Sequence, residues 1–262
     1  MNVPPAGTRE RWAWDYVLGA DLEGKLAPPP VPVAFEEAPP PRRLGAPGRP
    51  PELCVAPKAQ KSRGLGSARG RARQLHVFLH HELQAAELMA WAFLAFPDAP
   101  RDFREGLLRI CLDEVRHMGL YRRHIEALGF AVGDFEVRDW FWERVPLAPD
   151  PAAFVAVMGL GFEGGNLEHA RAFAERFRAA GDEEGARIQE LVGREEVAHV
   201  RFGAEWFRRL RGELTFEAWC AALPPPLSPM LMRGLPLDRE ARARAGLPEA
   251  FLDELEAWKP GY

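Results

Sequence analysis

Two short stretches of the sequence decide the fold: "DEVRH", residues 113–117, and "EEVAH", residues 195–199. In each stretch a glutamate is followed three residues later by a histidine, and the second copy lies 82 residues after the first. Residues three apart lie on the same face of an α-helix, so each pair presents a carboxylate beside an imidazole. The pairs are Glu114 with His117, and Glu196 with His199.

Both motifs lie in segments with the apolar spacing of a helix that faces a protein core. Glu114 and Glu196 fall within these apolar faces. A carboxylate that is buried without a partner costs several kcal/mol. A salt bridge is one solution, but few basic residues share these faces, so a bound metal ion is favoured. The apolar positions are Leu107, Cys111, Met118, Ile125 and Leu128 around the first motif, and Ile188, Val192, Trp206 and Leu210 around the second.

Helical periodicity predicts four long helices in two pairs, and the second pair follows the first by about 81–82 residues. This spacing indicates an internal duplication of a helical hairpin. The predicted long helices are 74–96, 101–128, 150–181 and 183–211, with short helices after Thr215 and near 248–258. We therefore predict an all-α fold with a four-helix bundle at 74–222, an arm and linker at 1–73, and a C-terminal extension at 223–262.

The N-terminal part of the chain is rich in proline, as in "APPPVPVAFEEAPPPRRLGAPGRPPELCVAP", residues 27–57. Proline lacks an amide donor and restricts the preceding residue, so we expect no regular helix in residues 1–60. A disordered tail and an extended arm lying on the body are both compatible with this composition. Residues 58–73 are basic and contain glycine. They are interpreted as a solvated linker, with a patch for phosphate or nucleic acid as the alternative.

A two-metal site in a helical bundle needs one further carboxylate from each of the other two long helices. Glu82 or Glu87 could serve in the first helix, and Glu163 or Glu168 in the third. Five residues turn a helix by about 140°, so we expect only one acid of each pair to face the core. The neighbours of Glu82 and Glu163 on the helix face are apolar, whereas those of Glu87 and Glu168 are mixed or charged.

We therefore predict a metal site made of four glutamates and two histidines. The four carboxylates balance the charge of two divalent ions, and oxygen with imidazole ligands suits iron or manganese. The predicted ligands are Glu82, Glu114, His117, Glu163, Glu196 and His199.

This order of ligands resembles the ferritin-like di-iron carboxylate superfamily. The segments "HHELQAAELMAWAFLAFPD", "DEVRHMGLY" and "REEVAHVRFG" look like an uncharacterised bacterial branch of it. The resemblance covers about residues 74–211. It implies a ferritin-like bundle with two Fe ions, or a manganese–iron pair, that reacts with dioxygen and draws on an electron donor.

The resemblance implies several activities, and the one we expect is an oxygenase or oxidase of a small-molecule or carrier-bound substrate. Iron oxidation, peroxide detoxification or iron storage, as in rubrerythrins and ferritins, is one alternative. A non-enzymatic, metal-stabilised scaffold is another. An RNA substrate is favoured only by the basic stretch 58–73. The oligomeric state is left open.

Two further features lie near the predicted ligands. Tyr121 follows His117 by one helical turn. The resemblance implies a redox-active tyrosine there, and a core aromatic with a hydrogen-bonded hydroxyl is the alternative. Glycines cluster around Glu163, which indicates room for dioxygen or substrate, a local helix distortion, or close helix packing. These glycines are Gly159, Gly161, Gly164 and Gly165.

Composition excludes several other kinds of protein. The three cysteines form no Cys-x-x-Cys motif, which argues against a disulfide framework or a cysteine-based zinc site. The formal net charge of −4 is not that of a nucleic-acid-binding chain. No apolar run suggests a signal core or a membrane span, so we expect a cytoplasmic protein with no membrane partner. The remaining histidines are expected at the surface, with a contact from His80 or His81 to a metal ligand as the alternative: His76, His80, His81, His124 and His169.

Overall fold

The computed structural model describes residues 2–56 and 64–260. Within these ranges all regular structure is helical, and the only β-type contacts are two isolated bridges. The all-α prediction is therefore confirmed. The chain divides into two compact units, Met1–Pro146 and Leu147–Tyr262, here called the N-terminal unit and the C-terminal unit. Each unit combines one long helical hairpin with the chain extension next to it, so the division separates the two predicted pairs of long helices.

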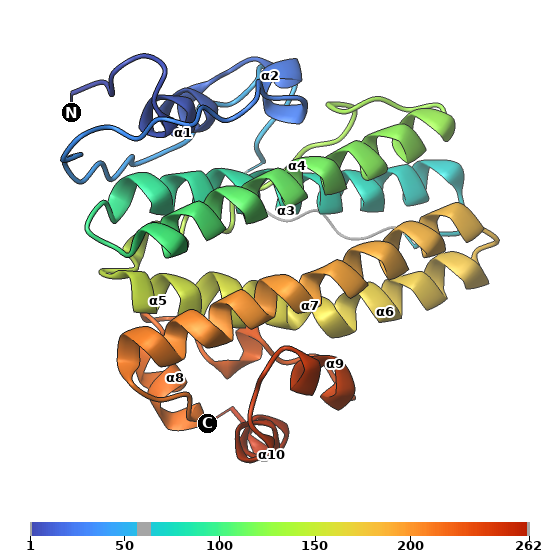
Figure 1. Ribbon diagram of the computed structural model, residues 1–262. Coiled ribbons are helices and arrows are strands. Elements are labelled where there is room, and N and C mark those ends of the chain that lie inside the picture. The colour runs from blue at the N-terminus through green and yellow to red at the C-terminus, as the bar shows by residue number, and fades with distance from the viewer. Residues whose placement is uncertain (1, 57–63, 261–262) are drawn as a thin grey trace. The chain divides into compact units, whose positions relative to one another are not determined.

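The N-terminal unit is built on the hairpin of α3, Ala68–Ala95, and α4, Arg101–Ala127, which lie side by side in Figure 1. The two helices predicted here are confirmed. Helix α3 begins earlier than predicted because the Ser67 hydroxyl caps it, accepting from the Gly70 amide at 3.1 Å. Gly129, with φ of 84°, follows the end of α4.

The prediction that residues 1–60 hold no regular helix is wrong for the first part of this segment. Helices α1, Arg9–Leu18, and α2, Leu22–Leu26, form there because this stretch contains no proline. Their N-termini are capped by the side chains of Thr8 and Asp21. The proline-free stretch runs from residue 6 to residue 27, and after Pro28 no helix occurs up to residue 56.

The proline-rich stretch from residue 27 to residue 56 lies on α3. The Leu44 carbonyl accepts from the Trp91 indole at 2.9 Å, and the Arg42 amide donates to the Leu94 carbonyl at 2.9 Å. This stretch therefore contacts α3 of its own hairpin at these two positions. Residues 57–63, which include the start of the predicted basic linker, lie outside the described residues. The end of that predicted linker forms the first turns of α3.

The C-terminal unit is built on the hairpin of α6, Glu163–Ala179, and α7, Glu183–Arg211. The predicted third helix is present, but it consists of three parts: α5, Pro151–Val155, the π-helical segment η2, Ala156–Phe162, and α6. Figure 1 shows α8, α9 and α10 gathered beside this hairpin. Their bounds are Phe216–Ala222 for α8, Arg239–Arg244 for α9 and Glu249–Ala257 for α10, and short 3-10 turns occur at Val145–Leu147 (η1) and Pro229–Leu231 (η3).

The glycines around Glu163 accommodate both a helix distortion and close packing. The π-helical segment is the predicted distortion. Gly159 also meets Gly203 of α7, where an added Cβ would lie 2.8 Å from the Gly203 Cα. On the other side, an added Cβ at Gly165 would lie 2.8 Å from the carbonyl oxygen of Leu231. Close packing therefore accompanies the distortion, and the C-terminal extension fills this side.

Among the described residues, no helix has the length and apolar character needed to cross a membrane.

Candidate metal centre

The N-terminal unit brings together three of the predicted ligands. Glu82 lies on α3, and Glu114 and His117 lie one turn apart on α4; all three side chains are buried. One ligand atom from each lies within 4.8 Å of the others. The His117 Nδ1 lies 3.0 Å from the Glu114 Oε2. These three residues are called the N-terminal triad.

The C-terminal unit repeats the arrangement. Glu163 begins α6 directly after the π-helical segment, and Glu196 and His199 lie one turn apart on α7. All three are buried, and one ligand atom from each lies within 4.8 Å of the others. The His199 Nδ1 lies 2.9 Å from the Glu196 Oε2, and the Asn166 amide donates to the Glu196 Oε1 at 3.2 Å. These three residues are called the C-terminal triad.

The chemistry of each triad fits a divalent cation. Two carboxylates with oxygens within 4.8 Å of each other in a buried site repel strongly, and they need a shared proton or a cation. A divalent ion balances both negative charges and leaves the histidine neutral, as a metal ligand requires. Two oxygen ligands and one imidazole suit iron or manganese.

The two acids that we did not predict as ligands, Glu87 and Glu168, are buried and not exposed. We expected Glu87 and Glu168 to face away from the core, but both side chains are buried. The prediction is wrong because it assumed that each long helix buries a single face. In each unit the chain extension covers a second face of the hairpin.

Glu87 is neutralised by two cations that precede the hairpin, Lys25 in α2 and Arg49 in the proline-rich stretch. Its Oε1 lies 2.8 Å from the Lys25 Nζ and 2.6 Å from the Arg49 Nη1. Its Oε2 accepts from the Trp142 indole at 2.8 Å. Burial lowers the pKa of Lys25, and the Glu87 carboxylate opposes that shift. The protein therefore compensates the charge of Glu87 by itself.

Glu168 is neutralised by one cation from the C-terminal extension. The Arg242 guanidinium donates to the two carboxylate oxygens at 2.8 and 2.6 Å. The Asp238 amide donates to the Glu168 Oε1 at 2.8 Å. Arg242 also donates to the carbonyls of Gly164 and Met232, at 3.0 and 2.6 Å. Glu87 and Glu168 thus form structural ion pairs, whereas the triad carboxylates gather around a histidine.

The histidines show where surface predictions failed. His76, His80 and His124 are buried, while His169 is exposed as predicted. The His80 Nε2 lies 2.9 Å from the Asp139 carboxylate. Burial lowers the pKa of His80, despite this contact. His76 and His80 were missed because they contact residues far away in the sequence, Gly133 and Asp139 respectively.

Tyr121 is buried, and its ring lies 5.8 Å from that of Phe78, centroid to centroid. It is a core aromatic in the N-terminal unit. Its redox activity stays a prediction.

Comparison with known proteins gives a family without a described activity. A family model described as "Protein of unknown function (DUF455)" matches residues 14–253. A curated relative from Haemophilus influenzae, described as "Uncharacterized protein", is 28% identical over 213 residues, which is 77% of this chain and 73% of the relative. No solved structure matches the chain significantly. Both triads lie within the matched range.

Proposed function

The chain belongs to the DUF455 family, and on that premise we propose that it is a non-haem di-iron protein that activates dioxygen and oxidises an organic substrate. One observation carries the proposal: each hairpin holds the same buried triad of two glutamates and a histidine. Each triad would bind one iron ion, so a chain would bind two. The two hairpins would then belong to one ferritin-like four-helix bundle.

When bound, the iron pair would supply the electrons and the open coordination positions that dioxygen reduction requires. The chain supplies the ligands and their orientation. Glu114 and Glu196 each lie against the histidine of the same triad, which restricts the rotation of both side chains. The Asn166 amide holds one oxygen of Glu196, so the second triad has an additional positioning contact.

Burial of the triads excludes water, which strengthens the electrostatic attraction between their carboxylates and a bound cation. Metal binding would displace any proton that the neighbouring carboxylates share. Proton release on metal uptake is therefore an expected property of the two triads.

The expected substrate is a small or carrier-bound organic molecule, and an external electron donor would reduce the iron between turnovers. The π-helical segment η2 ends directly before Glu163, and such segments occur frequently at functional sites. This supports substrate chemistry at the C-terminal triad over simple metal storage.

The test is anaerobic titration of the full chain with ferrous iron, followed by exposure to dioxygen. We expect iron binding to saturate at about two ions per chain, one for each triad, with proton release and then limited dioxygen consumption. Continued iron uptake after saturation would favour storage. Binding without dioxygen consumption would favour a metal-stabilised scaffold, and no iron binding would contradict the proposal.

A further inference from the structure

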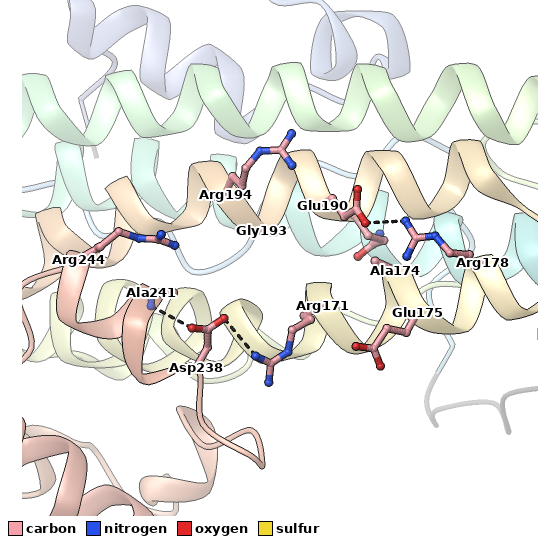
Figure 2. A pocket seen from close by; sticks show the side chains of 11 residues that line it. Arg171, Ala174, Glu175, Arg178, Glu190, Gly193, Arg194, Asp238, Ala241 and Arg244 are labelled. Carbon is pink, nitrogen blue, oxygen red and sulfur yellow. Dashed lines mark hydrogen bonds and ion pairs between the residues drawn. The ribbon is translucent and has the colours of Figure 1, made fainter.

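The C-terminal unit carries a pocket that none of the triad residues lines. It has a volume of about 270 Å³ and lies between α6, α7 and α9 (Figure 2). Three of its lining residues are small: Ala174 and Ala241 are buried, and Gly193 has no side chain. Gly193 is needed there because an added Cβ would lie 2.8 Å from the Cβ of Ala170. Helices α6 and α7 therefore lie close together at Gly193, and the small lining residues leave space for the pocket.

Four arginines line this pocket, and Figure 2 shows them on different sides of Gly193. They come from all three helices: Arg171 and Arg178 from α6, Arg194 from α7, and Arg244 from α9. Three carboxylates line the same pocket, so its formal charge is positive even though that of the whole chain is −4.

Two of the three carboxylates are already engaged. Glu190 lies 2.6 Å from the Arg178 guanidinium. Asp238 lies 3.3 Å from the Arg171 guanidinium, and it also caps α9 by accepting from the Ala241 amide at 3.0 Å. Arg171 and Arg178 thus each have a carboxylate partner within the lining of the pocket.

The other two arginines remain available for a ligand. Arg194 is exposed and makes no hydrogen bond or ion pair with any described residue. Within the described part of the chain, the Arg244 side chain forms an ion pair only with Glu240, one turn before it on α9, at 3.0 Å, and both side chains are largely exposed. Exposed pairs of this kind contribute little, so Arg244 can exchange this partner for an anion.

We propose that this pocket binds a small phosphate ester. Two guanidinium groups are available to a phosphate monoester, whose charge is about −1.5 to −2 at neutral pH, and Glu175 is the one lining carboxylate outside the two ion pairs, so the net formal charge of the pocket is +1. The planar guanidinium donates two parallel hydrogen bonds to phosphate oxygens. The pocket is slightly smaller than common ligand sites, which begin at about 300 Å³, so the organic part is small. This site is independent of the proposed metal centre.

Calorimetric titration of the full chain with phenyl phosphate tests the site, at constant ionic strength. We expect saturable binding of one ligand per chain. The Arg194→Gln variant should weaken it by about tenfold or more, and Arg194→Lys should weaken it less because it keeps the charge. The matched control is Arg187→Gln: Arg187 is an exposed arginine two turns earlier on α7 that does not line the pocket. It should leave the affinity unchanged.

Circular dichroism would verify that each variant is folded, and Arg244→Gln provides a second independent variant. Equal loss of affinity in Arg187→Gln would overturn the proposal, because the effect would then come from net charge. Absence of saturable binding would also overturn it. So would equal affinity for benzoate or for inorganic phosphate, which lack the phosphate group and the organic body respectively. Affinity for oligonucleotides that rises with their length would replace the proposal with a nucleic-acid surface.

Discussion

The two hairpins carry the same triad but neutralise their second glutamate differently. In the N-terminal unit Glu87 has two cationic partners, Lys25 and Arg49, both from the chain extension that precedes the hairpin. In the C-terminal unit Glu168 has one cationic partner among the described residues, Arg242, from the extension that follows the hairpin. Each second glutamate lies five residues after a triad glutamate. The ligand geometry therefore belongs to the hairpin, whereas the compensating charge comes from whichever extension covers it.

The two units also differ in the helix that carries the first glutamate of each triad. Helix α3 is continuous around Glu82, whereas Glu163 follows a π-helical segment. A π-helix carries one extra residue per turn, so it shifts the side chains that follow it relative to a regular helix. The two triads are thus equivalent in ligands and different in the backbone that supports one of them.

The largest expected effect is the loss of metal from one triad. Glu114→Ala should remove binding in the N-terminal triad and leave the C-terminal triad occupied, so iron content should fall from about two ions to about one per chain. Elemental analysis of the folded protein after anaerobic loading measures this. Glu126→Gln, an exposed acid on the same helix, is the control. Unchanged iron content in Glu114→Ala would contradict the ligand assignment.

The next largest expected effect comes from removing Arg242, the cation that is paired with Glu168. Arg242→Met leaves the Glu168 carboxylate buried without its partner, and we expect a destabilisation of about 3–5 kcal/mol. Urea unfolding of the metal-free protein measures this. The double variant Arg242→Met with Glu168→Leu should recover much of the loss. Equal stability of the single variant and the wild type would mean that this ion pair has no structural role.

Acid should destabilise the N-terminal unit through His76. Burial lowers the pKa of His76 from 6.5 to about 4, and its Nε2 accepts from the Gly133 amide at 2.8 Å. The unfolded chain therefore takes up this proton at higher pH than the folded chain. The stabilisation present above pH 6.5 is lost as the pH falls towards 4, by about 3 kcal/mol.

Hydrogen exchange measured between pH 7 and pH 4 follows this loss. Amides of α3 and α4 should lose protection as the pH falls, and His76→Gln, which keeps an acceptor for Gly133, should reduce that dependence. A pH dependence that is the same in the variant would assign the effect to another group.

The smallest expected effect comes from removing Lys25, one of the two cations that are paired with Glu87. In Lys25→Met the Glu87 carboxylate keeps Arg49 and the Trp142 indole as partners. We expect a destabilisation of about 1–2 kcal/mol, the cost of a lost charged hydrogen bond, and so less than that of Arg242→Met. The same urea experiment compares the two variants. A larger loss in Lys25→Met would reverse the comparison between the units.

Much of the fold was predictable because its signals are local. The helix bounds follow from apolar periodicity and from capping residues such as Asp150, Asp182 and Thr215, whose side chains accept from backbone amides three residues later. The gathering of Glu82 with Glu114 and His117 was also predicted. It follows from the spacing of Glu-x-x-His and from a neighbouring helix joined by a short connection.

The predictions that failed concern residues whose partners are distant in sequence. Lys25 and Arg49 precede Glu87 by 62 and 38 residues, and Arg242 follows Glu168 by 74. Helical periodicity gives the direction of a side chain around its own helix, but it does not say what covers that side. Glu87, Glu168 and His76 were therefore expected at the surface.

By itself, the sequence determined the helical class, the duplicated hairpin and the two triads, because each depends on residues within one or two adjacent helices. Only the tertiary structure decided which acids are neutralised by the protein. Burial and ion pairing depend on how the extensions fold onto each hairpin, and that packing joins residues that no local pattern connects. For the same reason, the pocket between α6, α7 and α9 had no signal in the sequence.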